Sequence, residues 1–482
     1  MVESKTDSFN QSSLIKLLKT LTVLEMREFD KFVRSPFHNN RGDVTRFFEV
    51  IKNFHPEFDD AEFRKEKIFS VLYPDEKYRD DVMRRLSSNL FKTVEEYGAY
   101  KTFRNDQYEF NRHLLEFQYS KGVDSLYLKQ QKKTEDFLEK QSLKDAKYFL
   151  NLNFLEELKR IFRIKSDPLG KKLEIQKQID SVWKYAIITL LRLYKVAIEN
   201  SKQYNKKYSN QHLPALLKIV EESDFTNSRA VEVWYYVIKF HTNSRNDSTF
   251  YTLKELFGRN LSIFDPLESF IICVSLLSYC FDMNITPSRN FHKEEFEIIR
   301  LMFNEGLLID GDTIHSDWFM FAFLSALRAG DIAYAENFLI DCKSKINRRE
   351  QENVVNHALA ELALEKKDFN AALKYLLVPK YNNVAEKLRA NQMYIKIYFE
   401  LKQSEQLFYA ADSFMHLIRD EASLSKEIKV IRENFVKFTL QVYRYSLGET
   451  KKTLLEIKKE IMNTKVLGNK WLLRKVDELE EK

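Results

Sequence analysis

Two stretches of this chain, residues 326–339 (ALRAGDIAYAENFL) and residues 363–376 (ALEKKDFNAALKYL), match each other at an offset of 37 residues. Both open with Ala-Leu, continue with Asp and a large apolar residue, and end with a spaced Ala and Leu. Small residues recur where two helices approach closely, and a large apolar residue begins the second helix of each pair. The pattern therefore predicts repeated pairs of antiparallel helices.

The pattern is similar to that of tetratricopeptide repeats, whose helix-turn-helix units are nominally about 34 residues long. A third, degenerate unit is predicted at 394–414, where Tyr398, Leu407 and Ala411 recur at an offset of 35 residues. One such unit cannot bury its apolar face alone, so we expect neighbouring units to stack into a solenoid. The alternative is a set of unrelated helical hairpins, in which alanine marks any close contact.

Glycine and proline are scarce along the whole chain. The 10 Gly and 8 Pro make up 18 of 482 residues, whereas an average protein has about 12% of them. Sheet-rich folds need glycine at left-handed turns and bulges, so this scarcity favours long helices joined by short loops. With 44% apolar and 31% charged residues, the composition is that of a soluble, core-forming chain. We expect an all-α protein.

The sequence predicts a reduced, cytoplasmic location. Three cysteines (Cys273, Cys280 and Cys342) cannot form a disulfide framework. The first 13 residues are polar and do not resemble a secretory signal. The longest uncharged apolar stretch, 269–281, has 13 residues, and a membrane span needs about 20. We therefore interpret 269–281 as a buried helix and expect no membrane association.

Four regions are predicted along the chain. Residues 1–98 form a compact helical domain, in which Thr22 and Glu25 make a capping box at a helix start. Residues 99–308 form a helical-hairpin region that contains a basic stretch at 159–218. Residues 309–446 hold the tetratricopeptide-like repeats, and residues 447–482 form C-terminal capping helices. Asp265-Pro266-Leu-Glu268 marks another helix start within the second region.

The chain also resembles an uncharacterised bacterial family of all-helical, tetratricopeptide-repeat-like proteins. The resemblance covers about 14–445 and is carried by Leu24-x-x-x-Glu28-Phe-x-x-Phe32-x-x-Ser35-Pro36-Phe37-x-Asn39, Lys67-Ile-Phe-x-x-Leu72-Tyr-Pro74, Arg85-Leu-x-Ser-x-Leu90, Ser278-Tyr-Cys280, Glu305-Gly-Leu-Leu308, Lys396-Ile-Tyr-Phe-Glu-Leu401 and Asp412-Ser-Phe414. It implies an architecture and no particular reaction.

The familiar catalytic motifs are missing. The nearest match to a phosphate loop, Gly306 to Thr313, has Asp312 where a lysine must neutralise the phosphates. No two glycines lie closer than Gly306 and Gly311, which excludes both G-x-G-x-x-G and G-x-S-x-G. The nine histidines show no metal-ligand spacing. We therefore expect no catalytic, cofactor or metal site and no enzyme activity, with an enzyme site inside the solenoid groove as a weaker alternative.

Positive charge concentrates in residues 159–218, which hold 14 Lys and Arg against 4 Asp and Glu, with aromatic residues interleaved. On the helix through 182–198, Lys184 and Lys195 lie about 20° apart and Arg192 about 60° away, so one exposed arc is predicted. An acidic protein partner, a nucleic acid and a merely solvated surface remain open as interpretations. The candidate partner-binding residues are Arg160, Arg163, Lys171, Lys172, Lys177, Lys184, Arg192 and Lys195.

The favoured hypothesis is a non-enzymatic scaffold whose concave helical surface holds another protein, with an acidic protein as one candidate. The alternative is a DNA-binding regulator, because residues 65–72, a turn and the helix from Tyr78 to Tyr97 resemble a helix-turn-helix. Its groove-facing residues would be Arg79, Arg84, Arg85 and Lys92. Against it, residues 1–100 carry a net charge of −1, and no strand pair follows Tyr97.

Overall fold

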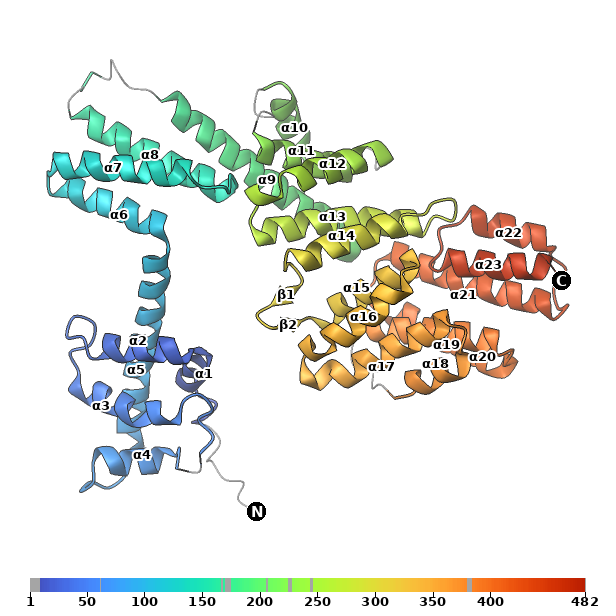
Figure 1. The fold of residues 1–482 in the computed structure, drawn as a ribbon, viewed down its shortest axis with the longest axis horizontal. Helices are drawn as coiled ribbons and strands as arrows, with labels where there is room; N and C mark the ends of the chain where they lie inside the picture. Colours follow the sequence, from blue (N-terminus) through green and yellow to red (C-terminus); the bar gives the residue numbers. More distant parts are fainter. Residues whose placement is uncertain are drawn as a thin grey trace. The chain divides into compact units, whose positions relative to one another are not determined.

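The computed structural model describes residues 9–60, 62–165, 168–169, 175–204, 207–223, 228–242, 246–378 and 384–481 (Figure 1). Apart from one two-stranded hairpin, the regular structure of these residues is helical, which confirms the all-α prediction. The chain packs into two compact units. The first unit comprises residues 1–140 and 157–173, and the second comprises residues 141–156 and 174–482.

The first unit contains α1 (Ser13–Thr20), α2 (Val23–Val33), α3 (Gly42–Ile51), a 3₁₀ turn (Lys52–Phe54), α4 (Lys65–Leu72), α5 (Asp80–Asn105), α6 (Gln107–Ser120), α7 (Asp124–Glu139) and the second half of α8 (Ala146–Ile164). The capping box predicted at α2 is present, since Thr22 Oγ1 accepts from the Glu25 amide and Glu25 accepts from the Thr22 amide. The boundary predicted at residue 98 lies inside α5, which continues to Asn105.

The second unit contains the first half of α8, α9 (Gln176–Tyr204), α10 (Leu213–Glu221), α11 (Arg229–Thr242), α12 (Asp247–Arg259), a 3₁₀ turn (Leu261–Ile263), α13 (Pro266–Asn284), α14 (His292–Asn304), β1 (Ile309–Asp310), β2 (Thr313–Ile314), α15 (Ser316–Ala329), α16 (Ile332–Cys342), a 3₁₀ turn (Lys343–Lys345), α17 (Arg348–Glu365), α18 (Phe369–Leu376), α19 (Val384–Glu400), α20 (Ser404–Asp420), α21 (Lys426–Ser446), α22 (Leu454–Met462) and α23 (Asn469–Glu480). The stretch around Gly311 forms the β1–β2 hairpin, with Ile309 paired to Ile314 and Asp310 to Thr313.

The matching stretches adopt the same local geometry in three successive hairpins. The turn between α15 and α16 has Gly330 at φ 88°, the turn between α17 and α18 has Lys367 at φ 62°, and the turn between α19 and α20 has Lys402 at φ 54°. Asp331 and Asp368 then cap the second helix by accepting from the amides of Tyr334 and Ala371. A left-handed residue followed by a capping residue reverses the chain sharply, so each pair of helices packs side by side.

The end of the chain returns to the middle of the second unit. The amide of Val466 donates to the Ile285 carbonyl at 2.9 Å. Asn469 Nδ2 donates to the Asn284 carbonyl at 2.7 Å. Trp471 on α23 also packs against Phe399 on α19, with ring centroids 5.1 Å apart. These contacts hold α23 against α19 and the end of α13.

Candidate interaction surfaces

The exposed basic arc predicted on α9 is not formed. Lys195 is only 3% exposed, and its Nζ lies 2.6 Å from Glu199 Oε2 on the same helix. Arg192 pairs with the buried Glu268 of α13, with Nη1 and Oε1 3.1 Å apart. Lys184 is partly buried, and its Nζ lies 5.6 Å from the centre of the Phe149 ring. The prediction failed because charges on one helix do not reveal the acidic and aromatic groups that other helices bring to them.

The other candidate cations of the basic stretch fall into two groups. Lys177 pairs with Glu156 at 3.3 Å, Arg160 lies 3.8 Å from Glu157, and Arg163 also has an interaction partner. Lys171 and Lys172 lie outside the described residues. The described members therefore act largely within the fold, and their role as a partner-binding face remains a prediction without structural support.

The solvent-facing side of α9 is apolar instead. Seven large apolar residues along it are between 40% and 62% exposed: Ile175, Ile179, Val182, Trp183, Leu190, Leu193 and Val196. We call this set the α9 seam. The opposite side of the helix, with Ile187, Ile188 and Leu191, is fully buried in the core of the second unit. The sequence does not show which apolar side of this helix is packed and which stays open.

The cations proposed for DNA binding are partly neutralised by acids at the start of α5. Arg79 Nη2 lies 2.9 Å from Asp81 Oδ2, and Arg84 Nε lies 2.8 Å from Asp80 Oδ2. Asp80 also accepts from Lys65 at 3.1 Å. For Arg85 and Lys92 the described residues provide no ion pair. The helix continues to Asn105 and is followed directly by α6, so a wing does not follow it in the described residues.

Charged side chains of α15, α17, α19, α21 and α23 interact electrostatically with one another inside the second unit. We call this set the inner face; it consists of Arg328, Glu361, Glu365, Arg389, Lys396, Arg432 and Arg474. Burial raises the pKa of Glu361, and Lys396 and Arg328 oppose this. Burial lowers the pKa of Lys396, and Glu361 and Glu365 oppose that. The inner face therefore holds five cations and two carboxylates. Glu361, Arg389, Lys396 and Arg432 are partly buried, and the other three side chains are exposed.

Two arginines of the inner face have incomplete hydrogen bonding. Arg389 Nη2 lies 3.1 Å from Asp317 Oδ1, but the buried Nε of Arg389 has no partner in the described part of the chain. The buried Nε of Arg432 has none either among these residues, and the charge that acts on this side chain is that of Arg389. Burial, together with the charge of Arg389, lowers the pKa of Arg432 to about 10. A guanidinium in such surroundings favours an incoming anion.

A small cavity lies beside Arg389. It has a volume of about 10 Å³ and is lined by Ser316, Met320, Asn353, Val354, His357, Glu386 and Arg389. That volume is roughly the room of one water molecule. Burial and the charge of Arg389 lower the pKa of His357 to about 3, so this imidazole is neutral at physiological pH and adds no positive charge.

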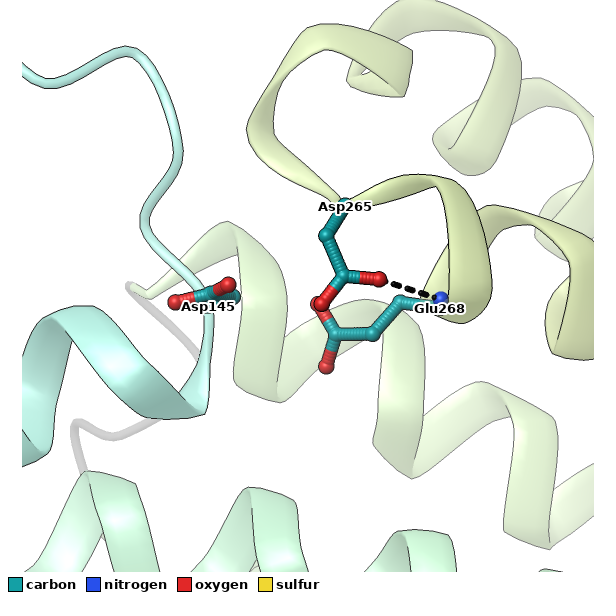
Figure 2. Close-up of side chains that lie close together, drawn as sticks. All are labelled: Asp145, Asp265 and Glu268. Atoms are coloured by element: carbon teal, nitrogen blue, oxygen red, sulfur yellow. Dashed lines mark hydrogen bonds between the residues drawn. The ribbon is translucent and has the colours of Figure 1, made fainter. Parts of the chain in front are cut away.

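Three carboxylates gather where α8 and α13 begin, as Figure 2 shows. One oxygen each from Asp145, Asp265 and Glu268 lie within 4.8 Å of one another. Oxygen ligands of this kind suit divalent cations. Each carboxylate already has a role in the fold, because Asp145 accepts from the Tyr148 amide at 2.8 Å, Asp265 accepts from the Glu268 amide at 2.7 Å, and Glu268 accepts from Arg192. Arg192 thus supplies positive charge where a metal ion would.

Burial determines the state of Glu268. The residue is 0% exposed, and burial raises its pKa to about 7, although the charge of Arg192 opposes the shift. The Asp265-Pro-Leu-Glu268 helix start was predicted from the sequence and is confirmed by the cap at Asp265. The meeting with Asp145 and Arg192 had no sequence signal, since these residues lie 120 and 73 positions from Asp265.

The apolar helix α13 is part of the core. It is long and apolar enough to cross a membrane, with a mean hydropathy of 1.4 over 18 residues. Nine of its residues are buried in the second unit, including Cys273 and Cys280. A core helix passes the same length and composition test, and the buried residues support the interpretation made from the sequence. Burial raises the pKa of the Cys273 thiol to about 12, so it is unreactive there.

Comparison of this chain with protein-family models, with curated proteins and with solved structures finds no match. The family resemblance given above therefore stays a prediction, and the functional argument rests on the surfaces described here.

Proposed function

We propose that this chain is a non-enzymatic, tetratricopeptide-like solenoid of the cytoplasm, and that its inner face binds an acidic segment of another protein. The shared turns at Gly330, Lys367 and Lys402 support a repeated array. In such an array one helix of each pair lines a common surface that suits peptide capture. The inner face draws its charged residues from α15, α17, α19 and α21 in this way, and from α23.

The observation that carries the proposal is Arg432. A buried guanidinium nitrogen without a hydrogen-bond partner is costly, and the Nε of Arg432 is such an atom in the described part of the chain. Arg389, the cation whose charge acts on Arg432, already has a carboxylate, since it pairs with Asp317. Arg432 has none among the described residues, and its side chain remains partly exposed. A carboxylate from a partner would supply the counter-ion that Arg432 lacks, because the guanidinium fork matches a carboxylate with two parallel hydrogen bonds.

The mixed charge of the inner face favours an acidic protein segment over a nucleic acid. A run of phosphates would have to pass Glu361 and Glu365, which would repel it. A peptide carries its carboxylates at intervals and can place a cationic or neutral residue beside these two glutamates. The inner face also replaces the stretch 159–218 as the place where positive charge is available to a partner.

Fluorescence anisotropy with a labelled peptide of eight glutamates tests the proposal. We expect saturable binding, and we expect Arg432→Gln to weaken it at least about tenfold, because a hydrogen bond to a charged group contributes about 1.5–3 kcal/mol. Arg389→Gln should act in the same direction. Arg444→Gln is the matched control, since Arg444 is an exposed arginine on the same helix, α21.

Two results would contradict the proposal. One is equal affinity of the wild-type chain for octaglutamate and octaglutamine. The other is tighter binding of a DNA duplex than of octaglutamate, together with weaker DNA binding by the Arg84→Gln and Arg85→Gln variants. That result would favour the DNA-binding alternative. The melting temperature of each variant, measured in parallel, separates a lost contact from a lost fold.

A further inference from the structure

The α9 seam has the spacing of a coiled-coil helix. Ile175, Ile179, Val182, Ala186, Thr189, Leu193 and Val196 follow one another at alternating intervals of four and three residues. This period of 3.5 keeps one side of a helix facing a partner helix, and each side chain can insert between four of the partner's. Trp183 and Leu190 widen the same side, and charged residues are absent from these nine positions.

The seam is distinct from the part of α9 that holds the fold together. Ile187, Ile188, Leu191 and Ile198 are at most 7% exposed and pack in the core of the second unit. These residues fall between the seam positions and lie on the other side of the helix, where α11 contacts α9. A helix with two apolar sides, of which one is already packed, has room for a further helix on the open side.

The pattern is self-complementary when two copies of α9 run in opposite directions. Ile179 of one copy then faces Val196 of the other, and Val182 faces Leu193. Ala186 and Thr189, both partly exposed, face each other near the two-fold axis, where small side chains let the helices approach. The antiparallel arrangement also places the two helix dipoles in the favourable orientation. Interfaces of this isologous kind are the commonest in homo-oligomers.

The exposed area is of the size that a dimer needs. The exposures of the seven residues of the α9 seam are together equivalent to about three fully exposed large side chains. At roughly 200 Å² for one large side chain, the seam offers about 600 Å² of apolar surface. A stable dimer buries about 800 Å² per partner, and the polar flanks of the helix can supply the difference. A patch of this size lies at the upper end of the roughly 300–600 Å² of the largest apolar patch on a typical monomer, and such patches are often functional.

We propose that the α9 seam docks a second copy of this chain through an antiparallel pair of α9 helices. This inference does not depend on the proposed function, because the inner face and the α9 seam consist of different residues on different helices. A dimer would present two inner faces, so it would bind a partner with two acidic segments more tightly than a partner with one.

Light scattering after size exclusion, on the full chain at micromolar concentration, tests the proposal. We expect twice the 57.6 kDa mass of one chain. Leu193→Glu places a charge in the middle of the seam and should return the mass to that of one chain, with an unchanged melting temperature because Leu193 is 62% exposed. Leu455→Glu is the matched control, since this leucine of α22 is 58% exposed and lies outside the seam; it should remain a dimer.

Engineered cysteines test the orientation. The natural cysteines are buried, so a chain with both Val182→Cys and Leu193→Cys should form a disulfide between copies, whereas Val182→Cys alone should not. A wild-type chain that has the mass of a monomer at every concentration tested would overturn the proposal. A dimer that survives Leu193→Glu would overturn it as well, because another surface would then hold the copies together.

Discussion

Replacing Glu268 by glutamine should remove one specific part of the pH dependence of stability. Burial raises the pKa of Glu268 from 4.5 to about 7. The folded state therefore binds the proton more tightly than the unfolded state, and stability falls as pH rises through this interval. One pKa unit corresponds to about 1.4 kcal/mol. The ionised Glu268 thus costs about 3 kcal/mol above pH 7, and this cost disappears below about pH 4.5.

Glutamine resembles the protonated carboxyl and can still accept a hydrogen bond from Arg192. Near pH 4.5 we expect the variant and the wild-type chain to have similar free energies of unfolding. Between pH 4.5 and pH 8 the free energy of unfolding of the variant should rise by about 3 kcal/mol relative to that of the wild-type chain. All other titrating groups are shared, so they cancel in the comparison.

Urea unfolding followed by tryptophan fluorescence is the suitable assay. All four tryptophans (Trp183, Trp234, Trp318 and Trp471) lie in the second unit, so the signal reports the unit that contains Glu268. A constant difference between variant and wild type from pH 4.5 to pH 8 would refute the reasoning. If the variant instead becomes less stable than the wild-type chain as pH rises, then Glu268 of the wild-type chain is ionised and is stabilised by Arg192.

Two further predictions concern the fold, and both use the same urea assay. Lys195→Ala should lower the free energy of unfolding by about 3–5 kcal/mol, because Glu199 would lose the cation of a buried pair; a loss below about 1 kcal/mol would contradict the structural role of this lysine. Gly330→Ala should lower the free energy of unfolding by about 1 kcal/mol, and Lys367→Gly should raise it by a similar amount, because both positions have positive φ. A stabilising Gly330→Ala or a destabilising Lys367→Gly would contradict the left-handed conformation of that turn residue.

Local chemistry made much of the fold predictable from the sequence. The capping box at Thr22 and the helix start at Asp265 depend on residues within one turn of each other, and both were found. The matching stretches from Ala326 and Ala363 were recognised because repeated hairpins reuse the same turn at the same place. The region boundary predicted at residue 98 lies within a helix, because α5 continues through Gly98 to Asn105.

The candidate sites depended on contacts between distant residues. Arg192 was predicted to lie on a binding face because its partner, Glu268, lies 76 positions away, and the sequence does not show that the two side chains meet. Arg389 and Arg432 were missed for the opposite reason, since the sequence does not show that a carboxylate is lacking nearby. The α9 seam did have a sequence signal in its intervals of four and three residues. That spacing alone does not separate an open apolar side from a packed one, since the core residues of the same helix are apolar too.

The most direct test of the central claim is the affinity of Arg432→Glu for the labelled octaglutamate peptide. This change gives Arg389 a carboxylate from the chain itself and reverses the charge that an acidic partner would meet. The account predicts that octaglutamate binding is lost, at a melting temperature no lower than that of the wild-type chain. Octaglutamate binding by Arg432→Glu at wild-type affinity would contradict the account, because the inner face would then not be where an acidic segment binds.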